Sequence, residues 1–198
     1  MDLMQFVVHN KSKIPEQIKD FDIIVKIHDN FDNECKAFPQ YLRYLHLGLD
    51  FNQEIKEFPQ HLLYLCLGGY FDKYIKKFPQ YLLYLILGYD FNQEINELPQ
   101  YLLYLDVSWE FDKKLPWHSQ HLRYLTLNGY KKFTLYKQNL LYLDLAHCSI
   151  KQIKTFPQYL SYLFLPRNFT RLLINYPKTL RKVSCYCFKE HLVPKHLQ

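Results

Sequence analysis

The sequence predicts a right-handed solenoid of about nine short units, each of about 20 residues, with a parallel β-sheet on its concave face. The first observation is a repeated phrase: the segment 38–48 returns from Phe58, from Phe78 and, with changes, from Leu98. The second is that a Phe-Asn or Phe-Asp pair follows each copy. Self-similarity at a fixed period of this size is typical of a solenoid, whose units bury their apolar side only against each other.

Each unit begins with a spacing of leucines, first seen at Leu42, Leu45 and Leu47. Alternation at Leu45 and Leu47 predicts a strand with these side chains inward and Tyr44 and His46 outward. Leu-x-x-Leu-x-Leu at this period is typical of a leucine-rich repeat at the short end of its range. A proline precedes most copies, as at Pro39, and predicts an extended or 3₁₀ return segment on the convex face.

The residue after the Phe of each Phe-Asn or Phe-Asp pair alternates between Asp and Asn along the chain. This column reads Asp32, Asn52, Asp72, Asn92 and Asp112. Both residue types accept a backbone N–H, whereas ionised Asp does not donate. The sequence therefore predicts a tight 3₁₀-like turn opening at each of these positions, with the side chain bonded locally.

The units divide the chain into three predicted segments. Residues 1–37 are predicted to form an N-terminal capping unit, with Ile24, Val25 and Ile27 as its strand. Residues 38–185 carry the repeats, with a step of 18 instead of 20 residues between Ser119 and Lys137. Residues 186–198 are predicted to be a C-terminal cap or a truncated further unit, because Val193–Leu197 resembles the opening of a unit.

Composition excludes several classes of protein. The net charge of +6 and pI of about 8.9 are too evenly spread to indicate nucleic-acid binding. Every apolar stretch falls short of the length that a membrane helix needs, so no membrane partner is predicted. The five scattered cysteines predict reduced thiols and a cytoplasmic location, which would be the host cytoplasm for a viral chain.

The repeats resemble the FNIP repeat, a leucine-rich-repeat variant of amoebae and of the giant viruses that infect them. Phe51–Ile55 and Phe91–Ile95 are similar to the Phe-Asn-x-x-Ile of that family, and Leu98–Leu102 is similar to its Leu-Pro-x-x-Leu. The resemblance covers Phe31 to about Leu115 closely. In that family the repeats often follow an F-box, but residues 1–37 read as a cap, so only a recognition role is implied.

The outward strand positions are the predicted binding surface. One column consists of seven tyrosines: Tyr44, Tyr64, Tyr84, Tyr104, Tyr124, Tyr142 and Tyr162. Stacked tyrosines stabilise a ladder, and they also provide rigid contact area at interfaces. The neighbouring column is mixed, and its His46, Asp106 and Asp144, together with Arg43 and Arg123, are the predicted polar determinants of specificity. Leu63, Leu83, Leu103 and Leu141 flank the tyrosines and either face outward or roll into the core.

Two groups of residues have the composition of a reactive site. His46 and Cys66 are expected on adjacent strands, as in a Cys-His nucleophile, but no oxyanion turn accompanies them. Cys185, Cys187, His191 and His196 have the residue types of a zinc site, yet Cys185 aligns with the inward Leu47. We therefore expect a protein that has no catalytic activity and that binds neither a cofactor nor a metal.

The predicted function is non-catalytic recognition of a protein partner, whose identity the sequence does not give, through the tyrosine-striped concave face. The alternative is a structural or assembly protein that self-associates through its solenoid end or its apolar concave face, giving a homo-oligomer. A third reading, nucleic-acid binding by tyrosine stacking with Arg43, Arg123 and Arg181, predicts steep salt dependence.

Overall fold

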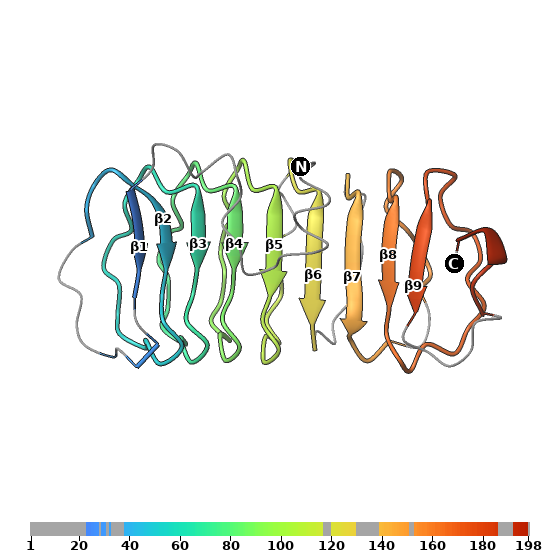
Figure 1. Cartoon of the computed structure of the whole chain (residues 1–198), viewed down its shortest axis with the longest axis horizontal. Helices are drawn as coiled ribbons and strands as arrows, with labels where there is room; N and C mark the ends of the chain where they lie inside the picture. The colour runs from blue at the N-terminus through green and yellow to red at the C-terminus, as the bar shows by residue number, and fades with distance from the viewer. Residues whose placement is uncertain are drawn as a thin grey trace.

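The computed structural model describes residues 23–27, 29–30, 32, 38–116, 120–129, 139–150, 153–185 and 192–197. These residues form one sheet of nine parallel strands whose spatial order is their order in the chain (Figure 1). The strands are β1 (Ile23–Lys26), β2 (Leu42–His46), β3 (Tyr64–Cys66), β4 (Tyr84–Ile86), β5 (Tyr104–Val107), β6 (Tyr124–Asn128), β7 (Tyr142–His147), β8 (Tyr162–Leu165) and β9 (Lys182–Cys185). The chain is therefore a leucine-rich-repeat-like solenoid, as predicted.

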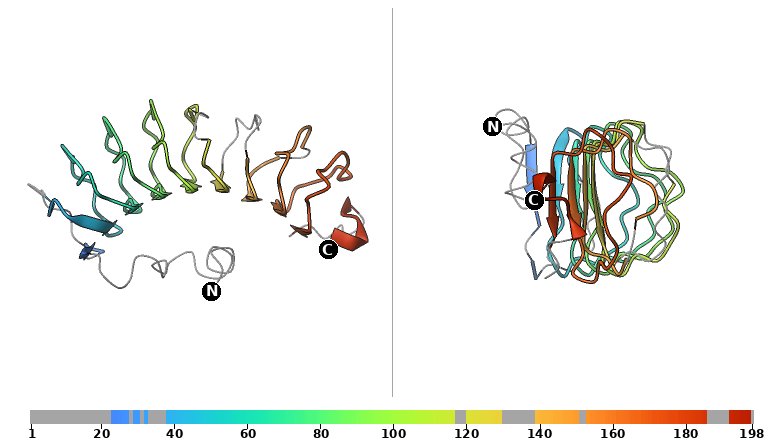
Figure 2. Two further views of the ribbon diagram at one scale, coloured as in Figure 1. Left: turned by 90° about the horizontal axis from the view of Figure 1, so that it is seen from above. Right: turned by 90° about the vertical axis from the view of Figure 1, so that its right-hand side faces the viewer.

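The sheet lies on the inner side of a curved array, and the return segments fan out on the outer side (Figure 2). Equivalent residues of consecutive units pair directly, so Tyr44 lies opposite Tyr64 and Leu45 opposite Leu65. The register shifts between β1 and β2, where Ile23 pairs with Leu42 but Ile24 pairs with Tyr44. It slips again between β6 and β7, where Thr126 pairs with Asp144 but Asn128 pairs with His147. This slip lies beside the unit whose step is 18 instead of 20 residues. At the slip, β7 contains one residue more than β6.

The core lies between the sheet and the return segments. Leu42, Leu45 and Leu47 are at most 1% exposed, and their equivalents in later units are also buried. Phe51, Phe71, Phe91 and Phe111 form a stacked column, with ring centroids 6.2–6.3 Å apart. A single unit buries these side chains only against its neighbours, which is why the repeats are stable as an array.

A short turn precedes most of the strands. The Leu42 N–H donates to the Pro39 carbonyl oxygen (3.1 Å), and the same bond recurs from Leu62 to Pro59 at 3.3 Å. Later copies join Leu82 to Pro79, Leu102 to Pro99, Leu160 to Pro157 and Leu180 to Pro177. This three-residue spacing is that of a 3₁₀ turn. The 3₁₀-like turns therefore lie at the proline positions, immediately before the strands.

The predicted turn at each Asp or Asn was wrong. These residues are in neither a turn, a helix nor a strand, and four of the side chains accept the backbone N–H of the equivalent residue one unit later. Asp32 accepts from Asn52 (2.8 Å), Asn52 from Asp72 (3.0 Å), Asp72 from Asn92 (2.8 Å) and Asn92 from Asp112 (3.0 Å). We call this row the Asx ladder. The expectation that both residue types act as acceptors was correct, but the donor belongs to the next unit, which the stacking of equivalent residues brings within hydrogen-bond distance.

The units also approach closely where the chain leaves the strand. A β-carbon at Gly68 or Gly88 would collide with the carbonyl oxygen of the glycine one unit earlier, at Gly48 or Gly68. Ser108 occupies the next equivalent position and donates its hydroxyl to the Phe91 carbonyl oxygen (2.6 Å). Glycine is thus needed in the tightly stacked units because no side chain fits between their backbones.

The ends of the array carry the predicted capping segments. β1 lies within the segment predicted as the N-terminal cap. Near the other end, the 3₁₀ helix η3 (Lys195–Leu197) includes an N–H bond from Leu197 to the Pro194 carbonyl oxygen (2.9 Å), the same turn that precedes the strands. Leu192, Val193 and Leu197 are buried against the core. The division of the chain into cap, repeats and further unit stays a prediction.

The cysteines differ from the expectation of uniformly reduced thiols. Cys66 and Cys148 are free, but Cys185 is disulfide-bonded. Its spacing gave no indication of a pair. In the described part of the chain no helix has the length and apolar character needed to cross a membrane.

Candidate functional site

Three columns of side chains cover the sheet face that is turned away from the core. The tyrosine column runs through the middle. On one side lies the leucine-arginine column, with Arg43, Leu63, Leu83, Leu103, Arg123 and Leu141, all half-buried. On the other side lies the mixed column, with His46, Cys66, Ile86, Asp106, Thr126, Asp144, Phe164 and Ser184. Together they cover the concave side of the sheet, whose strands Figure 2 shows along the inner side of the curved array.

The tyrosines face outward as predicted, but they are not an exposed stripe. Their rings form a cluster separate from the core, and the side chains from Tyr44 to Tyr142 are 1–6% exposed. Tyr44 and Tyr64 stack with ring centroids 4.2 Å apart, whereas Tyr84 and Tyr104 are tilted at 6.2 Å. A middle column is shielded by its neighbours above, below and on both sides, which explains the burial; Tyr162 near the end is half-buried.

The sequence left open whether Leu63 and Leu83 face outward or roll into the core. Both pack against the tyrosine cluster instead of entering the core, and both remain half-buried. They therefore contribute apolar surface to the concave face. The accessible part of this face comes from the leucine-arginine column and from the two ends of the mixed column, since Asp106, Thr126 and Asp144 in its middle are buried.

Burial changes the ionisation of the tyrosines. It raises the pKa of Tyr84 to about 12, and it raises the pKa of Tyr44, Tyr64 and Tyr104 as well. Asp106 contributes further to the raised pKa of Tyr104 through its negative charge. These hydroxyls are thus protonated over the physiological range and act as hydrogen-bond donors.

The hydroxyls of two tyrosines orient acidic side chains of the mixed column. The Tyr104 hydroxyl donates to Asp106 Oδ2 (3.3 Å), and the Tyr142 hydroxyl donates to Asp144 Oδ2 (3.5 Å). Each pair is two residues apart on one strand, so both side chains lie on the same face. Asp106 and Asp144 are 9% and 6% exposed. The predicted specificity residues therefore lie beside the tyrosines and are oriented by them.

The predicted basic residues lie at the start of the strands. Arg43 donates to the His61 carbonyl oxygen (3.3 Å), and Arg123 donates to the carbonyl oxygens of Gln120 (3.0 Å) and Leu122 (3.1 Å). They are 80 residues apart in the sequence and four strands apart in the sheet. The structure does not bring them together with Asp106 and Asp144 into one cluster.

His46 and Cys66 are neighbours, as the sequence predicts, because β2 and β3 pair them directly. Burial raises the pKa of the Cys66 thiol to about 12, with a further contribution from the negative charge of Asp106. A nucleophilic cysteine needs the opposite shift, toward the thiolate. This pair therefore lacks the activation that cysteine catalysis requires.

The predicted zinc residues are only partly described. Cys185 is disulfide-bonded, His196 is exposed and lies beside the Tyr176 ring, and Cys187 and His191 are outside the described ranges. Within the described ranges, no three His, Cys, Asp or Glu side chains are grouped closely enough to bind a metal ion.

Exposed aromatic rows border the concave face on both sides, and the sequence analysis did not identify them. The leading row precedes the strands and contains Tyr41, His61, Tyr81, Tyr101, His121 and Tyr159. Tyr81 and Tyr101 stack at 6.3 Å. The trailing row follows the strands, where Tyr89 stacks on Trp109 at 6.0 Å and Trp109 meets His147 at 4.7 Å. The leading row was visible in the repeated Pro-Gln-Tyr-Leu phrase, whose third residue recurs as Tyr or His.

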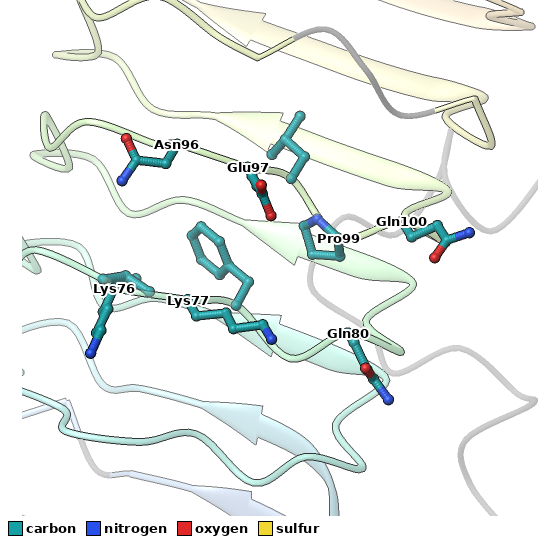
Figure 3. A pocket seen from close by; sticks show the side chains of 10 residues that line it. Lys76, Lys77, Gln80, Asn96, Glu97, Pro99 and Gln100 are labelled. Atoms are coloured by element: carbon teal, nitrogen blue, oxygen red, sulfur yellow. The ribbon is translucent and has the colours of Figure 1, made fainter.

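A groove lies on the convex side between two return segments (Figure 3). Its volume is about 540 Å³, and Lys76, Lys77, Asn96 and Glu97 lie along it with Phe78 and Leu98 at its base. Lys77 and Glu97 belong to one column of exposed charges that begins with Glu57. Because the lining mixes both charges on exposed side chains, the groove does not favour one kind of ligand.

The parallel sheet and the repeated columns on its concave face define a leucine-rich-repeat-like solenoid. The chain is similar to CroV588 of a giant virus, whose crystal structure is described as a novel circular leucine-rich-repeat protein. The two share 29% sequence identity with a TM-score of 0.62, over 84% of this chain and 26% of that one. This chain thus spans about a quarter of that protein's length. No family model and no curated protein match the chain, so membership of the FNIP family stays a prediction.

Proposed function

We propose that the chain is a non-catalytic recognition module that binds a protein partner on its concave face. The observation that carries this proposal is the row formed by Leu63, Leu83 and Leu103, half-buried on consecutive strands and backed by the rigid tyrosine column. Solenoids of this type commonly use their extended concave surface for binding. A row of partly exposed leucines on a preorganised sheet supplies apolar contact area at little entropic cost.

The tyrosines act in this proposal mainly from beneath the contact surface. Rings that are 1–6% exposed contribute little area, but they fix the positions of the side chains on both sides. Arg43 and Arg123, at the strand starts beside the leucines, would form the polar margin of the contact. His46 lies half-buried at the end of the mixed column and would contact the partner near β2.

A capture experiment with matched variants tests the proposal. The bait is the full chain, and the source is an amoebal lysate, chosen for the resemblance to amoebal and viral repeats. The test variant carries Leu63→Ser, Leu83→Ser and Leu103→Ser. The control carries Leu49→Ser, Leu172→Ser and Ile174→Ser, three apolar residues that are 49–57% exposed away from this row.

We expect one protein to be captured by the wild-type chain and by the control, and lost from the test variant. Circular dichroism and light scattering establish that all three chains are folded and of equal size. Equal capture by the test variant and the control would refute binding through the concave face.

End-to-end self-association is the second candidate function. β9 pairs with β8 on one side, and in the described residues no further strand pairs with its other side. Head-to-tail contacts of this kind close into rings when the rotation per subunit permits, and the similar CroV588 is itself circular. Light scattering of the purified chain decides between the candidates, since assembly predicts a defined oligomer and recognition predicts a monomer. A cytoplasmic location stays a prediction for both.

A further inference from the structure

Positive charge is concentrated in the last described units of the array. Residues 153–185 contain six Lys and Arg and no Asp or Glu, which gives a net charge of +6. Residues 38–116 contain seven Lys and Arg against ten Asp and Glu, which gives −3. The excess charge is therefore not evenly spread, in contrast to the expectation from overall composition. The array has an acidic part and a basic end.

The concave face changes its chemistry at this basic end. β8 and β9 lie at the C-terminal end of the array (Figure 1). Their concave side continues the leucine-arginine, tyrosine and mixed columns, in this order, with Ser161, Tyr162 and Phe164 at β8 and with Arg181, Lys182 and Ser184 at β9. The leucine-arginine column thus ends in a hydroxyl and a guanidinium, and the tyrosine column ends in an ammonium.

The cations at β9 are accessible from solvent. Arg181 and Lys182 are exposed, and their backbone N–H groups both donate to the Ser161 carbonyl oxygen (2.9 and 3.2 Å). Lys178 is exposed in the turn before β9. We call Lys178, Arg181 and Lys182 the basic patch. Because residues 153–185 contain no carboxylate side chain, no acidic neighbour within these units neutralises the patch.

Solubility alone does not account for the basic patch. A terminal unit needs a polar outer surface, but acidic residues or a mixture of both charges meet this need equally well. Three like charges within residues 178–182 also repel one another. A negatively charged ligand relieves this repulsion, so the patch favours an acidic partner.

We propose that the basic patch binds a segment of the protein partner that is rich in Asp or Glu. The inference rests on the proposed recognition function and states where the partner carries its charge. Apolar residues of the partner contact the leucine row from Leu63 to Leu103. Its carboxylates lie four strands beyond Leu103, at about 19 Å, because neighbouring strands are about 4.8 Å apart. Arg181 binds one carboxylate through two parallel bonds, and Lys182 binds another as a compact charge.

The rest of the concave face favours a protein segment over a nucleic acid. Phosphates follow one another at regular steps along a nucleic acid, so a basic groove has to track its backbone. From β3 to β7 the described concave face has one basic side chain, Arg123, whose guanidinium donates to two carbonyl oxygens. The same strands carry the carboxylates of Asp106 and Asp144. A peptide with apolar residues at one end and acidic residues at the other matches both parts of the face.

Nuclear magnetic resonance of the full chain, observed at its backbone amides, tests the inference. The probes are two short peptides of equal length with blocked ends, one of glutamate and one of glutamine. We expect the amide signals of Arg181 and Lys182 to shift and saturate with the glutamate peptide and not with the glutamine peptide. Added salt should weaken this binding, because exposed charges are screened.

Two matched variants locate the binding. Arg181→Gln, Lys182→Gln should bind the glutamate peptide about tenfold more weakly, since two ion pairs are lost. The control Lys154→Gln, Arg171→Gln removes the same charges from exposed positions of the return segments and should bind like the wild type. Circular dichroism establishes that both variants are folded.

Several results would overturn the inference. Absence of a saturable shift would reduce the patch to a polar cap, and equal binding of both peptides or undiminished binding by Arg181→Gln, Lys182→Gln would remove the acidic preference. Tighter binding of a deoxythymidine oligomer with the same number of charges would assign the patch to nucleic acid.

The capture experiment separates this failure from failure of the proposed function. A partner that is lost from the leucine variant but retained with unchanged affinity by an Arg181→Gln, Lys182→Gln bait would leave the concave face as a recognition surface and remove the acidic segment.

Discussion

Cys66 shows how the mixed column sets the chemistry of a single side chain. The residue lies half-buried on the concave face between His46 and Ile86, where a thiol invites a catalytic reading. Burial and the charge of Asp106 raise the pKa of its thiol from 9.0 to about 12. The fraction of thiolate near neutral pH is therefore lower than for a cysteine in the unfolded chain, and the thiol is a weak nucleophile.

We predict that Cys66 reacts slowly with iodoacetamide in the folded chain. A pKa raised by about three units lowers the thiolate fraction about a thousandfold. The thiolate of a thiol with a higher pKa is intrinsically more nucleophilic, which recovers part of this loss. The alkylation rate in the folded chain should therefore be about thirtyfold below the rate in the chain unfolded in urea. Asp106→Asn should speed the labelling by removing a negative charge, whereas Asp90→Asn should not. Mass spectrometry of the labelled peptide measures the rate. Equal rates in the folded and unfolded wild-type chain would contradict this account.

The Asx ladder is the element in which neighbouring units depend on each other most directly. Asp72 accepts the backbone N–H of Asn92 and also the side-chain amide of Gln93 (2.9 Å), whereas Asn92 accepts only the backbone N–H of Asp112 within the ladder. Asp32 repeats the double contact with Asn52 and Gln53. A glutamine thus follows in the unit after each of these Asp residues, and the true period of the ladder is two units.

Substitution of ladder residues should reveal this two-unit period. Asp72→Ala leaves two half-buried donors without their acceptor and should lower the free energy of unfolding by about 2–4 kcal/mol, against about 1–2 kcal/mol for Asn92→Ala. Asp72→Asn retains an acceptor oxygen and should cost less than about 1 kcal/mol. Urea unfolding of the three variants measures the order. Equal losses for the two alanine variants would favour local turns over a ladder between units.

The tyrosine column makes the fold sensitive to alkaline pH. Folded-state pKa values raised above the usual value of 10.0, to about 12 at Tyr84, mean that the folded chain holds protons that the unfolded chain releases. The resulting stability is present below pH 10 and is lost as pH rises toward 12. We predict a falling urea midpoint over this window. Tyr84→Phe should make the fall shallower, and Tyr81→Phe, on the exposed leading row, is the matched control; identical slopes for both variants would contradict the prediction.

Local patterns predicted the strands well, and contacts between units were harder to foresee. Leu42, Leu45 and Leu47 define a strand within one unit, so their spacing alone places it. The donor to Asp72 lies 20 residues away, so a local reading assigned its acceptor to a turn. The burial of Tyr84 depends on columns that become neighbours only in the sheet.

In the described residues the strands form a linear array in which each strand makes its main contacts with the strands beside it. Stability in such an array is a sum of unit terms and interface terms, so damage spreads along it instead of being shared equally. The phenylalanine column runs from Phe51 to Phe111, and among the described residues Phe169, after β8, is the next phenylalanine buried in the core. Between Phe111 and Phe169 the described core consists of smaller side chains such as Leu127, Leu145 and Cys148. We therefore expect the units at the two ends to be coupled less strongly than the units that share stacked rings.

Phe91→Ala tests this coupling, because Phe91 is fully buried and stacks between Phe71 and Phe111. Removing the ring should cost about 3–5 kcal/mol in the units that contact it. Hydrogen exchange should then show lost protection in β3, β4 and β5, with β8 and β9 close to wild type. Phe169→Ala should give the reverse pattern. A uniform loss of protection over all strands with either variant would contradict this prediction. It would show that the array unfolds as one cooperative unit instead of losing structure near the substituted residue.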